Sequence, residues 1–365
     1  MKKLFLFQIK NMRRFLFTIA AVSFLVCVGW FCFLGIRHSS TDYTRKICEE
    51  YQRKEALLSS EVQAYFENNQ GLDEASGEEL KEKMEEQSEL LSKMADARKS
   101  GDWRQELSLA IKQGEGELWL VENIRIAANV PKINDSIKLY QYLLEHDVEP
   151  KTPSNACDGW NVLVMYAKQF LPFLIPVLAM LFGAFGFITE RLHGGIKLLL
   201  QTPFSRTGMI ICKMGAALFM AVLSVTVTAV GAFAICSALF GVGNRYYPIL
   251  CDNGNIITTE SFLLQILLLA VCGVLFFTAF GMLLAVLIKN ESILAICAVA
   301  LPLLSFAVQS QMESGAAMIP LMSVNLSAVI LKGAAPVGVL CAAWLGFSVL
   351  CAVLACLFFK KKDLL

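Results

Sequence analysis

Six long runs of apolar residues, none of which contains Asp, Glu, Lys or Arg, constrain this chain more than any other feature. A helix rises about 1.5 Å per residue, so about 20 apolar residues cross the hydrocarbon core of a bilayer. A lysine or arginine at the centre of such a helix costs roughly 2.5–3.5 kcal/mol on insertion scales. We therefore predict six transmembrane helices, at residues 15–36, 169–188, 214–240, 261–288, 292–310 and 336–359.

The composition supports an all-α polytopic membrane protein. Hydrophobic residues make up 56% of the chain and charged residues only 17%, where an ordinary soluble domain carries about 25% charged residues. One further apolar run, 316–331, is short for a span and contains Pro320 and Asn325. We expect it to form a re-entrant hairpin within residues 311–335, just before the last span.

The distribution of basic residues predicts the orientation. Lysines and arginines collect on the cytoplasmic side of membrane proteins, and five of them precede the first apolar run while residues 360–362 are all lysine. Six spans place both ends in the cytoplasm, residues 1–14 as an amphipathic helix in the lipid interface and 360–365 as a tail. A seventh span at 316–331 would put the triple-lysine tail outside. The predicted location is the plasma membrane, with multiple passes.

Residues 37–158 then form one large extracytoplasmic domain. This segment holds 16 Lys/Arg and 25 Asp/Glu, and it shows helical periodicity with no strand pattern. The turn-forming residues 68–71 separate two amphipathic stretches, which predicts an antiparallel helical hairpin. A smaller helical part follows, and its expected core residues are Leu107, Ile111, Leu118, Trp119, Val121 and Ile124, with one further helix near 134–146. Cys48 and Cys157 lie near the two ends of this domain, and they either pair or remain free thiols.

Residues 161–359 contain spans two to six and a loop at 189–206 between spans two and three. The sequence TERLHGGIKLLLQTPFSRTGMIICK (189–213) places a Glu–Arg pair at the end of one span, then a two-glycine break and a short amphipathic piece. Pro203 is tolerated early in a helix because its missing N–H is not needed there. This pattern predicts a short helix on the cytoplasmic membrane surface. The alternative is that the charges of the loop only set topology.

The loop resembles the permeases of the type-two ABC exporter family. The residues that carry the resemblance are Glu190, Gly195, Leu198, Leu199, Pro203, Ser205, Arg206 and Lys213. The resemblance implies a coupling helix that docks onto a separate ABC ATPase, with ATP and Mg bound by that partner and not by this chain. It also implies a bacterial origin and a second copy or a paralogous permease to complete the transporter. The candidate coupling residues are Glu190, Arg191, Gly194, Gly195, Lys197, Leu198, Leu199, Pro203, Ser205 and Arg206.

The chain carries no motif for nucleotide binding or catalysis. It has no GxxxxGK[ST] phosphate loop, no HExxH pair and no Gly-x-Ser-x-Gly elbow. We therefore expect no enzyme activity, no cofactor or metal site and no nucleic-acid partner. The predicted function is the permease subunit of an exporter for a substrate such as a peptide, an antibiotic or a lipid. The alternative is a membrane receptor that binds a ligand through residues 37–158.

Overall fold

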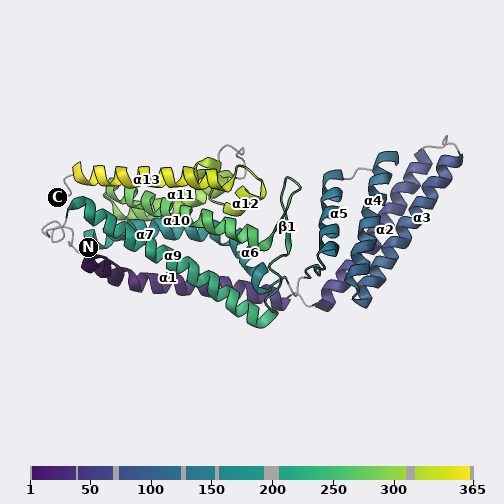
Figure 1. Ribbon diagram of the computed structural model, residues 1–365, viewed down its shortest axis with the longest axis horizontal. Coiled ribbons are helices and arrows are strands. Elements are labelled where there is room, and N and C mark those ends of the chain that lie inside the picture. Colours follow the sequence, from purple (N-terminus) through teal and green to yellow (C-terminus); the bar gives the residue numbers. More distant parts are fainter. Residues whose placement is uncertain are drawn as a thin grey trace.

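A computed structural model describes residues 2–37, 40–68, 74–124, 129–152, 156–192, 205–309 and 317–361. The described chain is almost entirely helical and has two parts (Figure 1). The larger part is a bundle of long, roughly parallel or antiparallel helices, and the smaller part, helices α2 to α5, lies beyond one end of the bundle. The bundle helices are α1 (Lys2–Arg37), α6 (Gly159–Gln169), α7 (Leu171–Leu192), α9 (Arg206–Phe240), α10 (Thr259–Leu287), α11 (Glu291–Gln309) and α13 (Val337–Lys361).

Four of these helices, α9, α10, α11 and α13, are long and apolar enough to cross a membrane. Helices α6 and α7 make a fifth candidate if they are taken as one span bent by 61°. Within α1, the stretch Ala21–Ile36 is apolar but shorter. The described residues therefore support four or five spans, and the sixth, expected at 15–36, stays a prediction.

The second expected span is not one straight helix from 169 to 188. Helix α6 ends at Gln169 and α7 begins at Leu171, and the chain bends between them. Pro172 explains the break, because it lacks the N–H that would bond to the carbonyl of Lys168 and its ring crowds that turn. The prediction located the apolar run, but its expected first residue, Gln169, is the last residue of α6.

The segment 1–14 is also continuous with the first apolar run. Helix α1 extends from Lys2 to Arg37 without interruption. No proline lies in this stretch, so nothing in the backbone chemistry separates an interfacial helix from the helix that follows. The expected boundary at residue 14 is not a helix boundary.

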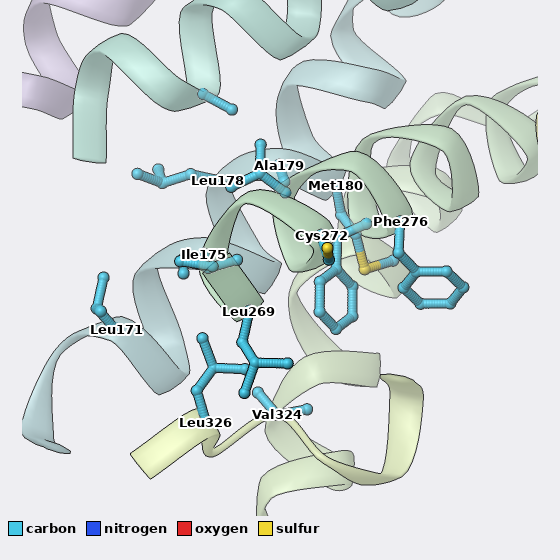
Figure 2. Close-up of a cluster of buried hydrophobic side chains, with 14 of the residues drawn as sticks. Leu171, Ile175, Leu178, Ala179, Met180, Leu269, Cys272, Phe276, Val324 and Leu326 are labelled. Atoms are coloured by element: carbon cyan, nitrogen blue, oxygen red, sulfur yellow. The ribbon is translucent and has the colours of Figure 1, made fainter. Parts of the chain in front are cut away.

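Helix α10 lies at the centre of the bundle and packs most extensively against α7 and α13. Most of its length is buried, which is why its sequence is apolar on every side. Figure 2 shows the side chains of α7 and α10 meeting those of the segment before α13. The labelled side chains are Leu171, Ile175, Leu178, Ala179, Met180, Leu269, Cys272, Phe276, Val324 and Leu326.

Two glycines let α7 and α10 approach backbone to backbone. A Cβ built on Gly281 would lie 2.5 Å from the carbonyl oxygen of Met180, and one on Gly183 would lie 2.5 Å from the carbonyl oxygen of Thr278. Small residues at such crossings allow the close van der Waals packing on which membrane helices depend. This contact joins α7 and α10 as one unit.

The smaller part consists of α2 (Ser40–Asn68), α3 (Glu74–Ser100), α4 (Trp103–Ile124) and α5 (Val130–Glu145), each packed against the next. Helices α2 and α3 form the expected hairpin, and α5 starts four residues before the expected helix, with Pro131 in its first turn. Leu107 is buried as expected, but Ile111, Leu118, Trp119 and Val121 are only half-buried, and the side chain of Ile124 lies outside the described residues. The buried residues of α4 also include Leu109, Ala110 and Leu120, which the sequence analysis did not select.

Two connections of the bundle carry local structure of their own. Between α9 and α10, the strands β1 (Pro248–Leu250) and β2 (Ile256–Thr258) pair antiparallel, with Ile249 opposite Ile257. This hairpin was not predicted. Before α13, the described part of 311–335 forms a 3-10 turn, η2 (Pro320–Met322), and a six-residue helix, α12 (Leu326–Leu331). Neither is long enough to span a bilayer, and the re-entrant path stays a prediction.

The close contact of α7 and α10 yields a direct test. Gly281→Val should lower the thermal unfolding midpoint of the detergent-purified protein, because the added side chain meets the backbone of α7, which cannot move aside cheaply. We expect the free energy of unfolding to fall by about 1–3 kcal/mol. Gly346→Val is the matched control, since a Cβ on Gly346 of α13 meets nothing within 4 Å. Equal midpoints for the two variants would contradict the close contact.

Candidate functional site

The helix ends around the loop between α7 and α9 lie at the end of the bundle that also carries both chain termini (Figure 1). Helix α7 ends at Leu192 and α9 begins at Arg206. The Nη1 group of Arg206 donates a hydrogen bond to the carbonyl oxygen of Lys360 at 3.3 Å. A guanidinium at the C-terminus of a helix satisfies a carbonyl that has no partner within the helix. The start of α9 is thereby attached to the end of α13.

Ser205 sets the first turn of α9. Its backbone is extended (φ −64°, ψ 144°) and its Oγ accepts a hydrogen bond from the amide of Gly208 at 3.1 Å. This is the geometry of an N-cap, in which a side-chain oxygen satisfies one of the free amides of the first turn. The loop therefore enters α9 at a defined angle.

Lys213 connects α7 to α9 two turns further into the bundle. Its side chain is 2% exposed, and its Nζ donates a hydrogen bond to the carbonyl oxygen of Gly186 at 2.8 Å. A buried ammonium is stable only when hydrogen-bond acceptors surround it. Gly186 lacks a side chain that would cover its carbonyl, and the position where its Cβ would stand lies 3.8 Å from the Cβ of Lys213. The two helices that flank the loop are thus held together directly behind it.

The start of α1 packs against the same part of α9. Phe5 contacts the buried side chains of Met209 and Cys212, and its ring centroid lies 6.4 Å from that of Phe219 in an edge-to-face arrangement. Aromatic pairs with this geometry stabilise packing beyond their buried area. The first turns of α9 therefore contact α1, α7 and α13.

At the far end of the bundle, a buried ion pair joins the α2–α5 part to α6. The Nζ of Lys151 lies 3.7 Å from Oδ2 of Asp158 and 4.3 Å from the centroid of the Tyr247 ring. Asp158 is also the N-cap of α6, because its Oδ1 accepts the amide of Asn161 at 2.7 Å. Burial raises the pKa of the Asp158 carboxyl and lowers the pKa of the Lys151 ammonium, and in each case the partner charge opposes the shift.

Tyr247 connects this joint, which is formed by Lys151 and Asp158, to the smaller part. Its hydroxyl accepts a hydrogen bond from the amide of Lys151 at 3.3 Å. Its side chain packs against the cluster of Leu107, Leu143 and Val148, which lies at the base of α4 and α5. The β1–β2 connection of the bundle thus reaches into the core of the α2–α5 part.

Glycine is required where the joint meets the end of α9. Gly243 has a φ of +75°, and a Cβ there would collide with the carboxylate of Asp158. The amides of Gly159 and Trp160 donate to the carbonyl oxygens of Gly241 and Val242, at 3.0 and 3.1 Å. These bonds satisfy the free amides at the start of α6 with backbone from the end of α9.

Comparison with known protein families identifies the family of this chain. The model of the ABC-2 family transporter proteins matches residues 8–364, which is nearly the whole chain. The chain belongs to the ABC-2 transporter family. It is therefore a multi-pass membrane protein and a permease subunit of an ABC transporter, and this family membership implies association with an ABC ATPase subunit. A comparison with curated proteins gave no match.

The structure describes only part of the loop that the ABC-2 resemblance singled out. Glu190 and Arg191 lie in the last turn of α7, with side chains outside the described residues, and Ser205 and Arg206 begin α9. The other candidate coupling residues lie outside the described residues: Gly194, Gly195, Lys197, Leu198, Leu199 and Pro203. The expected loop 189–206 is thus helical at both of its ends.

Lys213 and Gly186 were not among the candidate coupling residues, although they hold the flanking helices together. Lys213 belongs to the pattern that carries the family resemblance and is the second basic residue of α9 after Arg206, but nothing in that pattern indicated Gly186 as its partner. From the sequence alone, a lysine at that position is equally consistent with a side chain that extends to the membrane interface. The hydrogen bond that distinguishes the two is a tertiary contact.

Of the two alternatives for Cys48 and Cys157, the structure has the free thiols. The twelve cysteines are all free, and the thiol of Cys48 donates to the carbonyl oxygen of Ala95, at 3.8 Å, within the α2–α5 part. Cys157 instead lies just before α6 and interacts with Cys32 of α1 and Cys236 of α9. Among the described residues, no group of three or more His, Cys, Asp or Glu side chains is arranged to hold a metal ion.

The buried ion pair of the ABC-2 permease predicts an asymmetric pair of variants. Asp158→Asn keeps the cap of α6, because asparagine caps as well as aspartate, but it leaves Lys151 without a counter-charge. We expect a loss of about 3 kcal/mol in the free energy of unfolding at pH 7. The pKa of Lys151 is already below its usual value, so the loss should shrink as the pH rises toward about 10, where the unfolded-state lysine also loses its charge.

The double variant Lys151→Met/Asp158→Asn supplies the control for this prediction. It removes both charges, and we expect it to recover most of the stability that the single variant loses. Thermal or chemical unfolding of the purified protein measures both variants. A double variant that is no more stable than Asp158→Asn would show that the pair is not the source of the loss.

The N-cap of α9 yields a local test. Ser205→Ala should destabilise the first turn of α9 by about 1 kcal/mol, since the amide of Gly208 loses its acceptor. Hydrogen exchange of the peptide that covers residues 205–212 should become faster. Ser205→Asn restores a capping oxygen and should exchange at close to the original rate. Identical exchange for all three proteins would contradict the cap.

Proposed function

We propose that this permease is the membrane subunit of an ABC exporter, and that residues 189–206 couple it to ATP hydrolysis by a separate ATPase. The observation that carries this proposal is the hydrogen bond from Lys213 to the carbonyl of Gly186, directly behind the loop. Together with the bond from Arg206 to Lys360, it attaches both ends of the loop to the bundle. A force applied to the loop therefore reaches the bundle instead of deforming the helix ends.

The path of that force follows the packing. Helix α7 leaves the loop and is joined to α10 by the contacts of Gly183 and Gly281, so a displacement of the loop moves α7 and α10 together. Packed helices move as rigid units when an interface rearranges. A permease without a nucleotide site depends on such a rigid path, because the work comes from a partner that changes shape when it binds ATP and Mg.

The two ends of the molecule support the proposed orientation. Both termini and the ends of the loop lie at one end of the bundle, and the α2–α5 part lies beyond the other (Figure 1). This arrangement supports locations on opposite sides of the membrane. Basic residues at both termini favour the cytoplasm for that end, which leaves residues 37–158 outside.

A complete transporter needs two such permeases and two ATPases. Many large apolar side chains of α1, α9, α11 and α13 are exposed on this single chain, among them Leu25, Val230, Ile296 and Val349. Lipid and a second permease, either a copy or a paralogue, would cover these faces. The proposed substrate is a peptide, an antibiotic or a lipid.

The coupling proposal is tested on the complex of the permease with its ATPase, reconstituted in lipid. Deletion of 194–200 or Glu190→Ala should lower the permease-dependent ATPase activity by about fivefold or more, the range of a typical coupling free energy. Membrane insertion should be unchanged, because every apolar run is intact. Glu291→Ala is the matched control, since it removes a carboxylate from the other connection predicted to face the cytoplasm.

Unchanged ATPase activity and transport after the deletion would refute this location of the coupling element. An equal loss in the Glu291→Ala control would show that the effect is not specific to the loop between α7 and α9.

A further inference from the structure

Three cysteine side chains from three different elements meet at the end of the bundle next to the α2–α5 part. They are Cys32 of α1, Cys236 of α9 and Cys157, which lies just before α6. The thiol of Cys236 lies close enough to those of Cys32 and Cys157 to interact with both electrostatically, and Cys157 also interacts with Cys32. None of the twelve cysteines is in a disulfide.

The packing of the helices supports this meeting independently. A Cβ on Gly35 of α1 would collide with the ring of Phe240, and one on Gly231 of α9 would collide with the ring of Phe24. These two contacts show that α1 and α9 run parallel, with Cys32 and Cys236 at matching heights between them. A Cβ on Gly159 would collide with the hydroxyl of Ser237, which places the start of α6, and therefore Cys157, against the same turn of α9.

We propose that Cys32 and Cys236 form a redox-active dithiol site that closes to a disulfide between α1 and α9. The oxidant is a low-molecular-weight disulfide of the glutathione class. The thiolate of Cys32 attacks the oxidant, forms a mixed disulfide and releases one thiol. The thiolate of Cys236 then attacks the sulfur of Cys32 and releases the second thiol, so the two cysteines lose two electrons and two protons and the oxidant becomes two thiols.

Exposure determines the order of these steps. Cys32 is partly exposed, whereas Cys157 and Cys236 are 3% and 0% exposed. The first attack needs contact with the oxidant, and the second is intramolecular and needs only the neighbouring thiol. Buried thiols are poor nucleophiles because apolar surroundings disfavour the thiolate, so the reaction should be faster at alkaline pH.

A disulfide at this position would fix α1 to α9 next to the joint of Lys151 and Asp158. Helix α1 is connected to the rest of the bundle in sequence only through the α2–α5 part. A covalent link to α9 would therefore prevent α1 from moving independently of α9 when the α2–α5 part changes position. This site needs neither the proposed coupling loop nor a particular substrate.

The chain offers a matched comparison pair. The thiols of Cys272 in α10 and Cys341 in α13 also lie close enough to interact with each other. They join two other helices and have no third thiol among their interactions. The variant Cys272→Ser/Cys341→Ser removes this pair and leaves the proposed site intact.

The test uses the full-length protein, purified in detergent and incubated with oxidised glutathione at pH 8. The free thiols, counted after unfolding, should fall from the twelve in the sequence to ten. Mass spectrometry of the unreduced digest should show the peptide of Cys32 linked to the peptide of Cys236. Cys32→Ser should abolish this loss of thiols, and Cys272→Ser/Cys341→Ser should leave it unchanged.

Four results would overturn the proposal: retention of all twelve thiols, glutathione adducts without a cross-link, a Cys32–Cys157 bridge, or a bridge at Cys272 and Cys341 alone. The first measurement uses the unchanged chain, so it does not depend on whether a cysteine variant folds. The thiol measurement is also independent of transport, so failure of the coupling proposal would not contradict the dithiol proposal.

Discussion

Where α7 crosses α10, glycines at positions 183 and 281 bring the two backbones so close that a single added Cβ would meet a carbonyl oxygen of the other helix. The rest of the bundle is arranged around this contact. Helix α10 is buried along most of its length, and α13, α12 and the β-hairpin pack around it. Because lipid is as apolar as the side chains, such close packing, not the hydrophobic effect, holds membrane helices together.

Helix α7 connects this contact to both ends of the permease. In one direction it leads to the loop before α9, where Lys213 and Arg206 hold the flanking helices. In the other it reaches the 61° bend into α6, whose first residue follows the Asp158 cap. One continuous path therefore joins the proposed ATPase side to the α2–α5 part. Its rigid section is α7 packed against α10, and its bend lies between α6 and α7.

The two lysines of this path, Lys213 and Lys151, have different kinds of partner. Lys213 donates to a backbone carbonyl that a glycine leaves uncovered, whereas Lys151 is paired with a carboxylate and lies on an aromatic ring. The pKa of Lys151 is lowered and the pKa of Asp158 is raised, and both shifts favour the neutral form of the group. Burial therefore outweighs the attraction between the two charges.

The sequence by itself determined which segments are apolar, that residues 37–158 contain a separate helical part, and that the chain resembles ABC-2 permeases. These properties depend on hydrophobicity and periodicity over tens of residues, which are local and additive. The tertiary structure decided the β-hairpin after α9, the partners of Lys213 and Lys151, and the meeting of Cys32 with Cys236 instead of Cys48 with Cys157. Each depends on which helices are neighbours and in what register, and that choice is made by packing between residues far apart in the chain.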